Sequence, residues 1–306
     1  MPELPEVETI KRGLSKFCVH QKIRKVMVLC EKSFIGPKEV VLRREIIGFR
    51  RFGKALVIDL SDGVSMMIHL RMTGQLIYRA AGQNANLMED SFAGGHPSES
   101  FVDTLPNKQT RVIFEMDGGT LYFNDQRKFG FVKVLPTEEV ETDKFIASLA
   151  PEPWKTRPEA LYEVFQRRSG SPVKAVILDQ KVIAGIGNIY ADEALFYAGV
   201  HPRRLCGSLS LAETAKIIEG ACKAMDVSIE SGGSTMATYV RADGTRGDYL
   251  EKFAQVFRRE GLPCMRCGNE IIKIRVAGRG THICPHCQKE DIGASSASAA
   301  KGGSDD

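Results

Sequence analysis

The sequence contains no run of 18 consecutive apolar residues, and its first residues, Met1-Pro2-Glu3, carry no positive charge. A helix that crosses a membrane needs about 20 mainly apolar residues. A secretory signal begins with a basic region that precedes an apolar stretch. Both absences predict a soluble, cytoplasmic protein without a membrane partner.

A strong excess of one charge is also missing, since the net charge of the 306 residues is only +4. The charge is uneven, because the residues after Cys287 include two basic and four acidic side chains, which leaves residues 1–287 with a net charge of +6. The moderate positive charge of residues 1–287 weakly favours a polyanionic partner.

The eight cysteines do not indicate disulfide bonds, because a reducing compartment keeps thiols free. Four of them are scattered among apolar neighbours and are expected to be small buried side chains: Cys18, Cys30, Cys206 and Cys222.

The other four cysteines form two close pairs near the end of the chain, in the pattern Cys264-x2-Cys267-x16-Cys284-x2-Cys287. Four thiolates complete the tetrahedral shell of Zn2+, so we expect one structural zinc ion, and His286 is not needed as a ligand. The segments IIKIRV and GTHIC predict a β-hairpin with Arg279 at its tip. Zinc ribbons also serve protein contacts, but an arginine between glycines favours phosphate.

The length and the hydrophobic content of 43% are sufficient for two compact domains. We expect the first domain at residues 1–136, beginning with an amphipathic helix over residues 4–17. Six segments have the composition of strands: IRKVMVL, KALVIDL, VSMMIHL, RVIFEM, GTLYFND and FVKVL. Residues 80–108 show no clear period and are expected to form an inserted loop.

After residue 150 the pattern changes to helices, which are predicted over residues 158–168, 188–198 and 211–230. We expect a helical domain at residues 151–256, with a glycine-rich loop at 232–247, and a zinc module at residues 257–292. Residues 293–306 have the composition of a disordered tail. The predicted fold class is therefore α+β with two domains.

The first eight residues, MPELPEVE, place two prolines and three carboxylates at the start of a helix. The simpler interpretation is a well-formed helix start, since proline and acidic residues are both favourable there. A chemical interpretation requires loss of Met1, which leaves Pro2 with a free secondary amine whose pKa is about 8 in model compounds. Pro2 could then attack a sugar C1′, while Glu3 transfers protons and Glu6 orients the amine. These residues alone leave both interpretations open.

A series of motifs covers nearly the whole chain outside residues 80–108 and the tail: MPELPEVET, RFGKALVIDL, HLRMTGQL, FNDQRKFG, APEPW, IAGIGNIYADEALFYAGVHP, SGGST, ADGTRGDY, LPCMRC and ICPHCQK. In this order they closely resemble the formamidopyrimidine-DNA glycosylases, bacterial enzymes that remove 8-oxoguanine from DNA. The related endonuclease VIII proteins typically have glycine where this chain has Leu4, so Leu4 favours the oxidised-purine branch.

The resemblance implies an antiparallel β-sandwich in the first domain and a helix-two-turns-helix in the second. It implies a bifunctional glycosylase and abasic-site lyase in which Pro2 attacks C1′ and β,δ-elimination cuts the strand. Lys54 would lie beside the reacting sugar and assist β-elimination, and Arg279 would grip flanking phosphates and assist δ-elimination. Without the resemblance, Lys54 would be interpreted as a solvated lysine at the end of a strand.

The resemblance also implies binding of damaged double-stranded DNA, from which the target nucleotide must leave the stack. Met72, Arg127 and Phe129 would fill the gap, although Met72 and Phe129 alone would be interpreted as core residues. The glycines before Asn188 would open a phosphate-binding helix, although an N-cap without a ligand gives the same pattern. Residues 232–247 resemble a lid over the lesion.

Two further positions match the family less closely. Arg168 lies in a region where the family offers another phosphate contact, and Gln109 stands where many members have a histidine that faces DNA. Together with Glu6, they complete the set of candidate DNA-binding residues.

We therefore expect a monomer, associated with the bacterial nucleoid through DNA, that removes oxidised purines and needs no nucleotide cofactor. One alternative is an endonuclease VIII-like glycosylase for oxidised pyrimidines. Another is a catalytically silent zinc-containing DNA-binding protein, against which the presence of Pro2, Glu3 and Lys54 argues. A zinc-ribbon adaptor would leave the amino-terminal residues unexplained.

Overall fold

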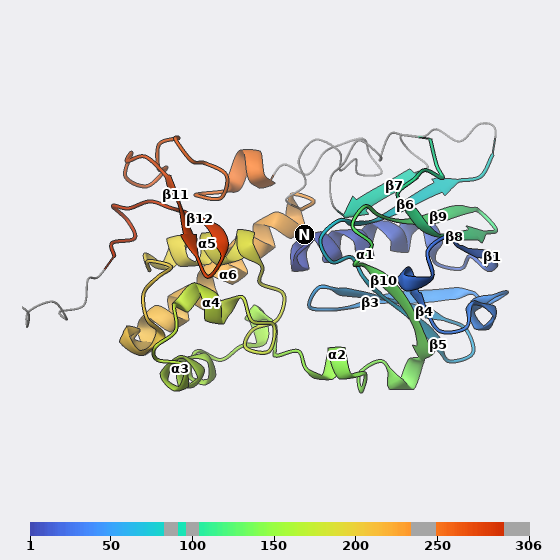
Figure 1. Cartoon of the computed structure of the whole chain (residues 1–306), viewed down its shortest axis with the longest axis horizontal. Helices are drawn as coiled ribbons and strands as arrows, with labels where there is room; N and C mark the ends of the chain where they lie inside the picture. The colour runs from blue at the N-terminus through green and yellow to red at the C-terminus, as the bar shows by residue number, and fades with distance from the viewer. Residues whose placement is uncertain (83–90, 96–103, 234–248, 291–306) are drawn as a thin grey trace, which may run out of the picture.

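The amino-terminal half of the protein is built around a long first helix and two five-stranded sheets (Figure 1). The computed structural model describes residues 1–82, 91–95, 104–233 and 249–290. The first sheet is antiparallel, with the order β1 (Ile23–Val28), β8 (Thr110–Met116), β9 (Gly119–Asp125), β6 (Gly74–Ala80), β7 (Ser91–Gly95). The second is antiparallel except for its first pair, with the order β2 (Phe34–Ile35), β10 (Phe131–Pro136), β5 (Val64–His69), β4 (Ala55–Leu60), β3 (Ile46–Phe52).

Helix α1 (Leu4–Cys18) shares one hydrophobic core with both sheets. Its residues Val7, Ile10 and Leu14 are fully buried in this core. All six residues of strand β4 are buried. Since side chains alternate along a strand, they divide between two hydrophobic clusters on opposite faces of the sheet. Leu56 and Ile58 enter the core with α1, whereas Ala55 and Val57 enter a second cluster with Ile146 of α2 (Lys144–Ala147).

The carboxy-terminal half contains the helices α3 (Pro158–Arg167), α4 (Val173–Ile177), α5 (Asn188–Ala198) and α6 (Leu211–Glu230). Helix α6 begins with a capping box between Ser210 and Glu213, and α5 ends at Gly199, whose φ of 68° is left-handed. Single helical turns complete the structure: η1 (Glu31–Ser33), η2 (Lys38–Val41), η4 (Thr137–Glu139), η5 (Pro153–Lys155), η6 (Cys206–Ser208) and η7 (Tyr249–Phe253). Across the described ranges, no helix has the length and apolar character needed to cross a membrane.

The first turn of α1 joins the two halves. Leu4 is fully buried and belongs to the hydrophobic core of the helical half, together with Ile186 and Tyr190, whereas Val7 and Ile10 belong to the core of the sheets. The amino terminus accordingly lies between the two halves (Figure 1).

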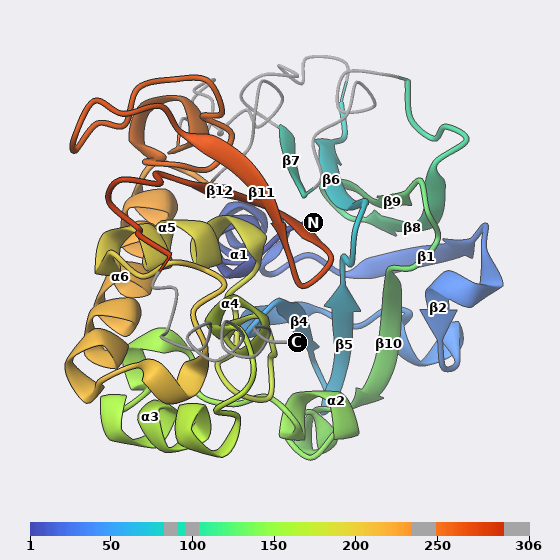
Figure 2. The same ribbon diagram turned by 60° about the vertical axis from the view of Figure 1, so that its left-hand side comes forward.

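The zinc module contains the predicted hairpin, formed by β11 (Ile272–Val276) and β12 (Arg279–Ile283). Ala277 and Gly278 have φ values of 49° and 75°, which is the conformation of a two-residue turn that fits the twist of a hairpin. Arg279 therefore lies directly after the turn. Figure 2 shows the hairpin in front of α5, with its tip directed toward the junction between the halves.

The predicted α+β fold class is confirmed, but three expectations need correction. Residues 91–95 of the expected inserted loop form strand β7, because Phe92 packs over α1 at Gly13 and is 2% exposed. Strands β3 and β6 were not expected. Cys30 and Cys222 are only half-buried, unlike the other two scattered cysteines. Most of the predicted lid and all of the predicted tail lie outside the described residues.

Candidate active site

The amino-terminal segment lies at the junction of the two halves. Met1 is 42% exposed, whereas Pro2 and Glu3 are buried. Glu3 is the N-cap of α1 and forms a capping box with Glu6, whose Oε2 accepts the N–H of Glu3 at 2.8 Å. Burial lowers the pKa of the Met1 amino group, against the opposing charges of Glu3 and Glu6. The acidic residues thus both cap the helix and surround the amine.

The carboxylate of Glu3 also caps a second helix. Its Oε1 accepts the N–H of Ile189 at 3.0 Å, and its Oε2 accepts the N–H of Tyr190 at 3.4 Å. Both N–H groups belong to the first turn of α5, where the helix dipole favours negative charge. Burial raises the pKa of Glu3, and the charge of Lys54 opposes this rise. The sequence predicted that this helix start binds phosphate, but these two amides bind a carboxylate of the protein itself.

Two glycines before α5 make room for the amino-terminal segment. A Cβ atom on Gly187 would lie 2.2 Å from Cδ of Glu3, and one on Gly185 would lie 2.3 Å from Cδ1 of Leu4. Gly185 also has a φ of 91°, which favours glycine. The close approach of α1 therefore explains the GIG sequence without a ligand.

Lys54 lies in the turn between β3 and β4 and is only 6% exposed, so it is not a solvated lysine. Its Nζ donates to the carbonyl oxygen of Ile186 at 2.8 Å. Burial lowers the pKa of Lys54, while the charges of Glu3 and Glu6 counteract this effect and that of Arg279 adds to it. Lys54 and Glu3 are thus electrostatically coupled beside the amino terminus.

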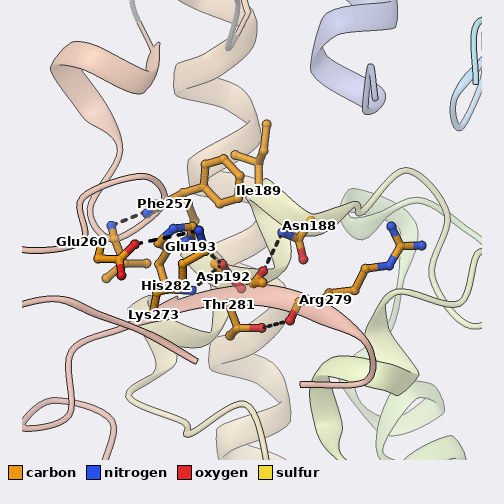
Figure 3. A network of polar contacts seen from close by, with 12 residues as sticks. Asn188, Ile189, Asp192, Glu193, Phe257, Glu260, Lys273, Arg279, Thr281 and His282 are labelled. Carbon is orange, nitrogen blue, oxygen red and sulfur yellow. Dashed lines mark hydrogen bonds and ion pairs between the residues drawn. The ribbon is translucent and has the colours of Figure 1, made fainter. Parts of the chain in front are cut away.

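The hairpin tip is attached to the start of α5. Nδ2 of Asn188 donates to the carbonyl oxygen of Gly280 at 2.9 Å, next to Arg279. Figure 3 shows the side chain of Arg279 extending away from this contact. The charge of Arg279 acts on Lys54, which brings the predicted hairpin arginine and the predicted catalytic lysine into one site.

A buried ion pair fixes the hairpin on the helical half, and Figure 3 shows its acidic member, Asp192, beside Thr281 and His282 of the hairpin. Lys174 and Asp192 are fully buried, and Nζ of Lys174 lies 2.6 Å from Oδ1 of Asp192. Lys174 also donates to Oγ1 of Thr281 at 2.7 Å, and Asp192 accepts the N–H of His282 at 2.9 Å. Burial lowers the pKa of Lys174, against the charge of Asp192. The position of Arg279 therefore depends on this network.

A second cluster connects α1, β3 and the link between the halves. Arg51 is 12% exposed on its side chain and donates to Oε2 of Glu8 at 2.9 Å and to Oε1 of Glu152 at 2.5 Å. Burial alone would raise the pKa of Glu8, but hydrogen bonds from Lys11, Arg51 and Arg12 lower it to about 2. This cluster holds the helix that carries the amino terminus.

The three predicted gap-filling residues lie in the loops that follow β5 and β9. Met72 is half-buried, and Phe129 is 56% exposed, so Phe129 is not a core residue. The guanidinium of Arg127 lies 5.1 Å from the ring centre of Phe129. The N–H of Arg127 donates to Oγ1 of Thr73 at 3.0 Å, which ties the two loops together. An exposed ring beside a cation is compatible with insertion into DNA, which stays a prediction.

The two less certain DNA-binding candidates have partners within the protein. Gln109 is half-buried, and its N–H donates to Oδ1 of Asn107 at 2.9 Å. Arg168 follows α3 and donates to Oδ2 of Asp179 at 2.9 Å. Their contacts with DNA stay predictions.

The four predicted zinc ligands converge in the zinc module. Their Sγ atoms all lie within 4.8 Å of one another, and two of the separations are 4.0 Å and 3.4 Å. Zn–S bonds of about 2.3 Å in a tetrahedron place the sulfur atoms about 3.8 Å apart. This arrangement of Cys264, Cys267, Cys284 and Cys287 fits one closed zinc site.

Three family models match successive parts of the chain. The formamidopyrimidine-DNA glycosylase N-terminal domain matches residues 1–132, the formamidopyrimidine-DNA glycosylase H2TH domain matches residues 149–240, and the zinc finger found in FPG and IleRS matches residues 261–289. The chain belongs to the formamidopyrimidine-DNA glycosylase family. The resemblance drawn from the sequence is thereby confirmed, as is the prediction of one structural zinc ion.

Relatives in this family match over almost their entire length. The formamidopyrimidine-DNA glycosylases of Desulfitobacterium hafniense and Pelotomaculum thermopropionicum are 36% and 39% identical over 94% of this chain and 100% and 99% of their own. The Lactococcus lactis Fpg in complex with DNA that contains an abasic site has a TM-score of 0.81 at 30% identity, covering 94% of this chain and 100% of its own. MutM (Fpg) from Thermus thermophilus has a TM-score of 0.78 at 34% identity, covering 94% and 99%.

Two residues with important contacts, Tyr190 and Lys174, were not among the predicted site residues. Tyr190 follows the GIGN motif, but its apolar neighbours gave no sign of its contacts with Glu3. Lys174 was detectable in principle, because it is a single charge within the apolar run PVKAVIL. A lysine in such a run is expected to have a buried partner.

Proposed function

We propose that the protein is a base-excision-repair glycosylase that removes oxidised purines, such as 8-oxoguanine and formamidopyrimidines, from duplex DNA and cuts the abasic strand. Family membership supports this activity. So do the complexes of the Lactococcus lactis relative with DNA that contains an abasic site or Fapy-dG. The observation that carries the proposal is the meeting of the buried Pro2-Glu3 segment with Lys54 and with the charge of Arg279.

Pro2 is the proposed nucleophile once Met1 has been removed. Its nitrogen forms a bond to C1′, and the glycosidic bond breaks with its electron pair leaving on the damaged base. The bound nitrogen loses its proton, and its lone pair then breaks the C1′–O4′ bond, which opens the sugar ring and gives an iminium ion with a protonated O4′. Loss of a proton from C2′ expels the 3′ phosphate by β-elimination, and loss of a proton from C4′ expels the 5′ phosphate by δ-elimination. The burial that lowers the pKa of the amino group of Met1 supports a neutral amine at this location.

Glu3 is the proposed proton carrier, and Lys54 is its proposed partner. Burial raises the pKa of Glu3, which supports a carboxyl group that can give a proton as well as accept one. Lys54 is proposed to lie beside the sugar and its phosphate and to assist β-elimination. Its burial supports a strong effect of its charge, because less water screens it.

Asn188 and Arg279 are the proposed phosphate contacts, and Arg279 is also proposed to assist δ-elimination. The hydrogen bond from Asn188 to Gly280 supports a joint role, since it holds the hairpin against α5. Glu6 is proposed to orient the amine. DNA affinity that rests on such contacts falls as the salt concentration rises.

Met72, Arg127 and Phe129 are proposed to occupy the space that the extruded nucleotide leaves. The exposure of Phe129 and its contact with Arg127 support this role. Gln109 and Arg168 are proposed as further DNA contacts, and residues 232–247 as a lid over the lesion.

We further propose domains at residues 1–136, 151–256 and 257–292, and a protein that acts as a cytoplasmic monomer without a nucleotide cofactor. When bound, zinc supplies the bonds that hold the hairpin in place. The closed set of four cysteine ligands supports this structural role.

Borohydride reduction in the presence of an abasic duplex tests the proposed chemistry, because it converts the iminium ion into a stable covalent complex. Peptide mapping is expected to locate the cross-link at Pro2 in protein that has lost Met1. Pro2→Gly retains an amino-terminal amine but loses the secondary amine, and its trapping rate is expected to fall at least about tenfold. A cross-link at a lysine would contradict the mechanism.

Comparison of defined duplexes tests the substrate class. We expect faster release of 8-oxoguanine than of thymine glycol. Faster release of thymine glycol would support the oxidised-pyrimidine alternative, and stable DNA binding without any trapped complex would support a protein that only binds DNA.

A further inference from the structure

Tyr190 contacts both acidic residues of the amino-terminal segment. Its backbone N–H donates to Oε2 of Glu3 at 3.4 Å, and its hydroxyl donates to Oε1 of Glu6 at 2.7 Å. Tyr190 is fully buried. We propose that Tyr190 is a positioning residue that fixes these two carboxylates relative to each other, and that Ser228 fixes its hydroxyl. This role rests on the proposed function of the amino-terminal segment.

The direction of the hydrogen bonds follows from the chemistry of the groups. Both oxygens of Glu6 act as acceptors, Oε2 of the N–H of Glu3 and Oε1 of the single phenolic proton of Tyr190. Burial and the charge of Glu6 raise the pKa of Tyr190 well above its usual value, so the hydroxyl keeps this proton. Oγ of Ser228 lies 2.6 Å from the phenolic oxygen and therefore donates to it.

Glu6 connects the hydroxyl of Tyr190 to the segment that contains Pro2, the proposed nucleophile. Its second oxygen, Oε2, accepts the N–H of Glu3 at 2.8 Å. That N–H belongs to the peptide bond between Pro2 and Glu3. The hydroxyl of Tyr190 therefore determines how the carboxylate of Glu6 is oriented, and this carboxylate in turn holds the peptide that follows the reactive nitrogen.

Ser228 connects these contacts to the end of α6. Its carbonyl oxygen accepts the N–H of Gly233 at 2.7 Å. A Cβ atom on Gly233 would lie 3.6 Å from Oγ1 of Thr9 and 3.8 Å from Cγ of Glu6. The turn that ends α6 thus packs against α1 beside the same carboxylate that Tyr190 holds.

Tyr190→Phe tests the proposal because it removes only the hydroxyl. Its affinity for a duplex with an uncleavable abasic-site analogue is expected to stay within about twofold of the unmodified protein, because the hydroxyl of Tyr190 is fully buried and is not available to a ligand at the surface. The single-turnover rate constants for 8-oxoguanine release and for borohydride trapping are expected to fall about tenfold, which corresponds to a lost hydrogen bond to a charged group.

Tyr197→Phe is the matched control. It lies on the same helix, and its hydroxyl donates to Oε1 of Glu219 at 2.7 Å, away from the amino terminus. Both rate constants are expected to remain unchanged in this variant.

Ser228→Ala tests the direction of the contacts independently and covers the case in which Tyr190→Phe does not fold. We expect it to slow trapping about threefold in the unmodified background and to have no further effect in Tyr190→Phe, since Ser228 acts only through the hydroxyl. If Ser228→Ala slowed trapping equally in both backgrounds, Ser228 would not act through the hydroxyl of Tyr190, and this part of the proposal would be overturned.

The rate constants are measured per active molecule, counted by titration with DNA, so a loss of folded protein alone does not change them. Normal rate constants in Tyr190→Phe would overturn the proposal. Absence of trapping in the unmodified protein would contradict the proposed function instead, which keeps the two failures distinguishable.

Discussion

Glu3 and Lys54 experience opposite effects of the same burial. Burial raises the pKa of Glu3 and lowers the pKa of Lys54, while the charge of each residue favours the ionised form of the other. Two groups coupled in this way titrate together rather than independently.

Gly187→Ala is expected to displace Glu3, because the added Cβ would lie 2.2 Å from its Cδ. We expect the trapping rate to fall at least about tenfold and the free energy of unfolding to fall by about 1–3 kcal/mol. Single-turnover trapping and urea denaturation measure the two effects. Gly170→Ala is the control, since a Cβ there meets nothing within 4 Å. Normal trapping in Gly187→Ala would show that the position of Glu3 is not critical.

Glu8 is expected to make stability depend on pH in the acidic range. Its pKa is lowered from 4.5 to about 2 in the folded protein, so its ionised form stabilises the fold above pH 4.5, and this contribution disappears as the pH falls to about 2. At pH 7, Glu8→Gln is expected to lower the free energy of unfolding by roughly 1–3 kcal/mol, and the difference from the unmodified protein should shrink below pH 5.

Urea denaturation at a series of pH values measures this difference. Glu138→Gln serves as the control, because Glu138 is exposed and is expected to contribute little at any pH. A difference for Glu8→Gln that stays constant from pH 7 to pH 3 would mean that the charge of Glu8 is not its source.

At the scale of elements, the attachment of the hairpin to α5 depends on the buried pair of Lys174 and Asp192. Lys174→Met leaves a buried charge without its partner, so we expect a loss of about 3–5 kcal/mol in the free energy of unfolding. Addition of Asp192→Leu is expected to recover part of this loss. Arg167→Ala breaks an exposed pair with Glu163 and should cost less than about 1 kcal/mol in the same urea titration. Equal losses in Lys174→Met and Arg167→Ala would refute this account of the hairpin.

The longer helices α1, α3, α5 and α6 could be predicted almost to the residue, because their signals are local, whereas the short helices α2 and α4 were not predicted. Helix α5 starts directly after Gly187 and ends at Gly199, and both glycines are visible in the sequence. The zinc ligands were equally accessible, since their spacing is dictated by the geometry of the ion. Strand β7 could not be predicted, because its sequence SFAGG does not alternate apolar and polar residues. The strand instead depends on packing against α1.

The sequence indicated which residues form the site, but not which of them contact each other. The hydrogen bond between Tyr190 and Glu6 joins residues 184 positions apart, and nothing near Tyr190 in the sequence indicates a carboxylate. The sequence indicated that the start of α5 offers free N–H groups, but it did not reveal that Glu3 accepts two of them, because Glu3 is 186 positions from Ile189. The contact of Asn188 with phosphate stays a prediction.

For the whole molecule, Leu4 is the residue through which α1 enters the second core. Leu4→Ala is expected to cost about 2–5 kcal/mol and to accelerate hydrogen exchange in β4 as well as in α5, because α1 loses its hold on both halves. Leu161→Ala, which affects only the helical core, should accelerate exchange in that half alone. Unchanged exchange in β4 of Leu4→Ala would mean that the halves are stabilised independently.

The enclosure of Pro2 has a consequence for how the molecule is made. The groups that bind Glu3 and Lys54 belong to residues 186–190, which a ribosome synthesises long after the first residues have emerged. If Pro2 acts as proposed, Met1 is expected to be removed by a methionine aminopeptidase during this interval, before α5 encloses the amino terminus. Slow processing would leave a molecule with the same fold and the same zinc site, but with its amine blocked by Met1.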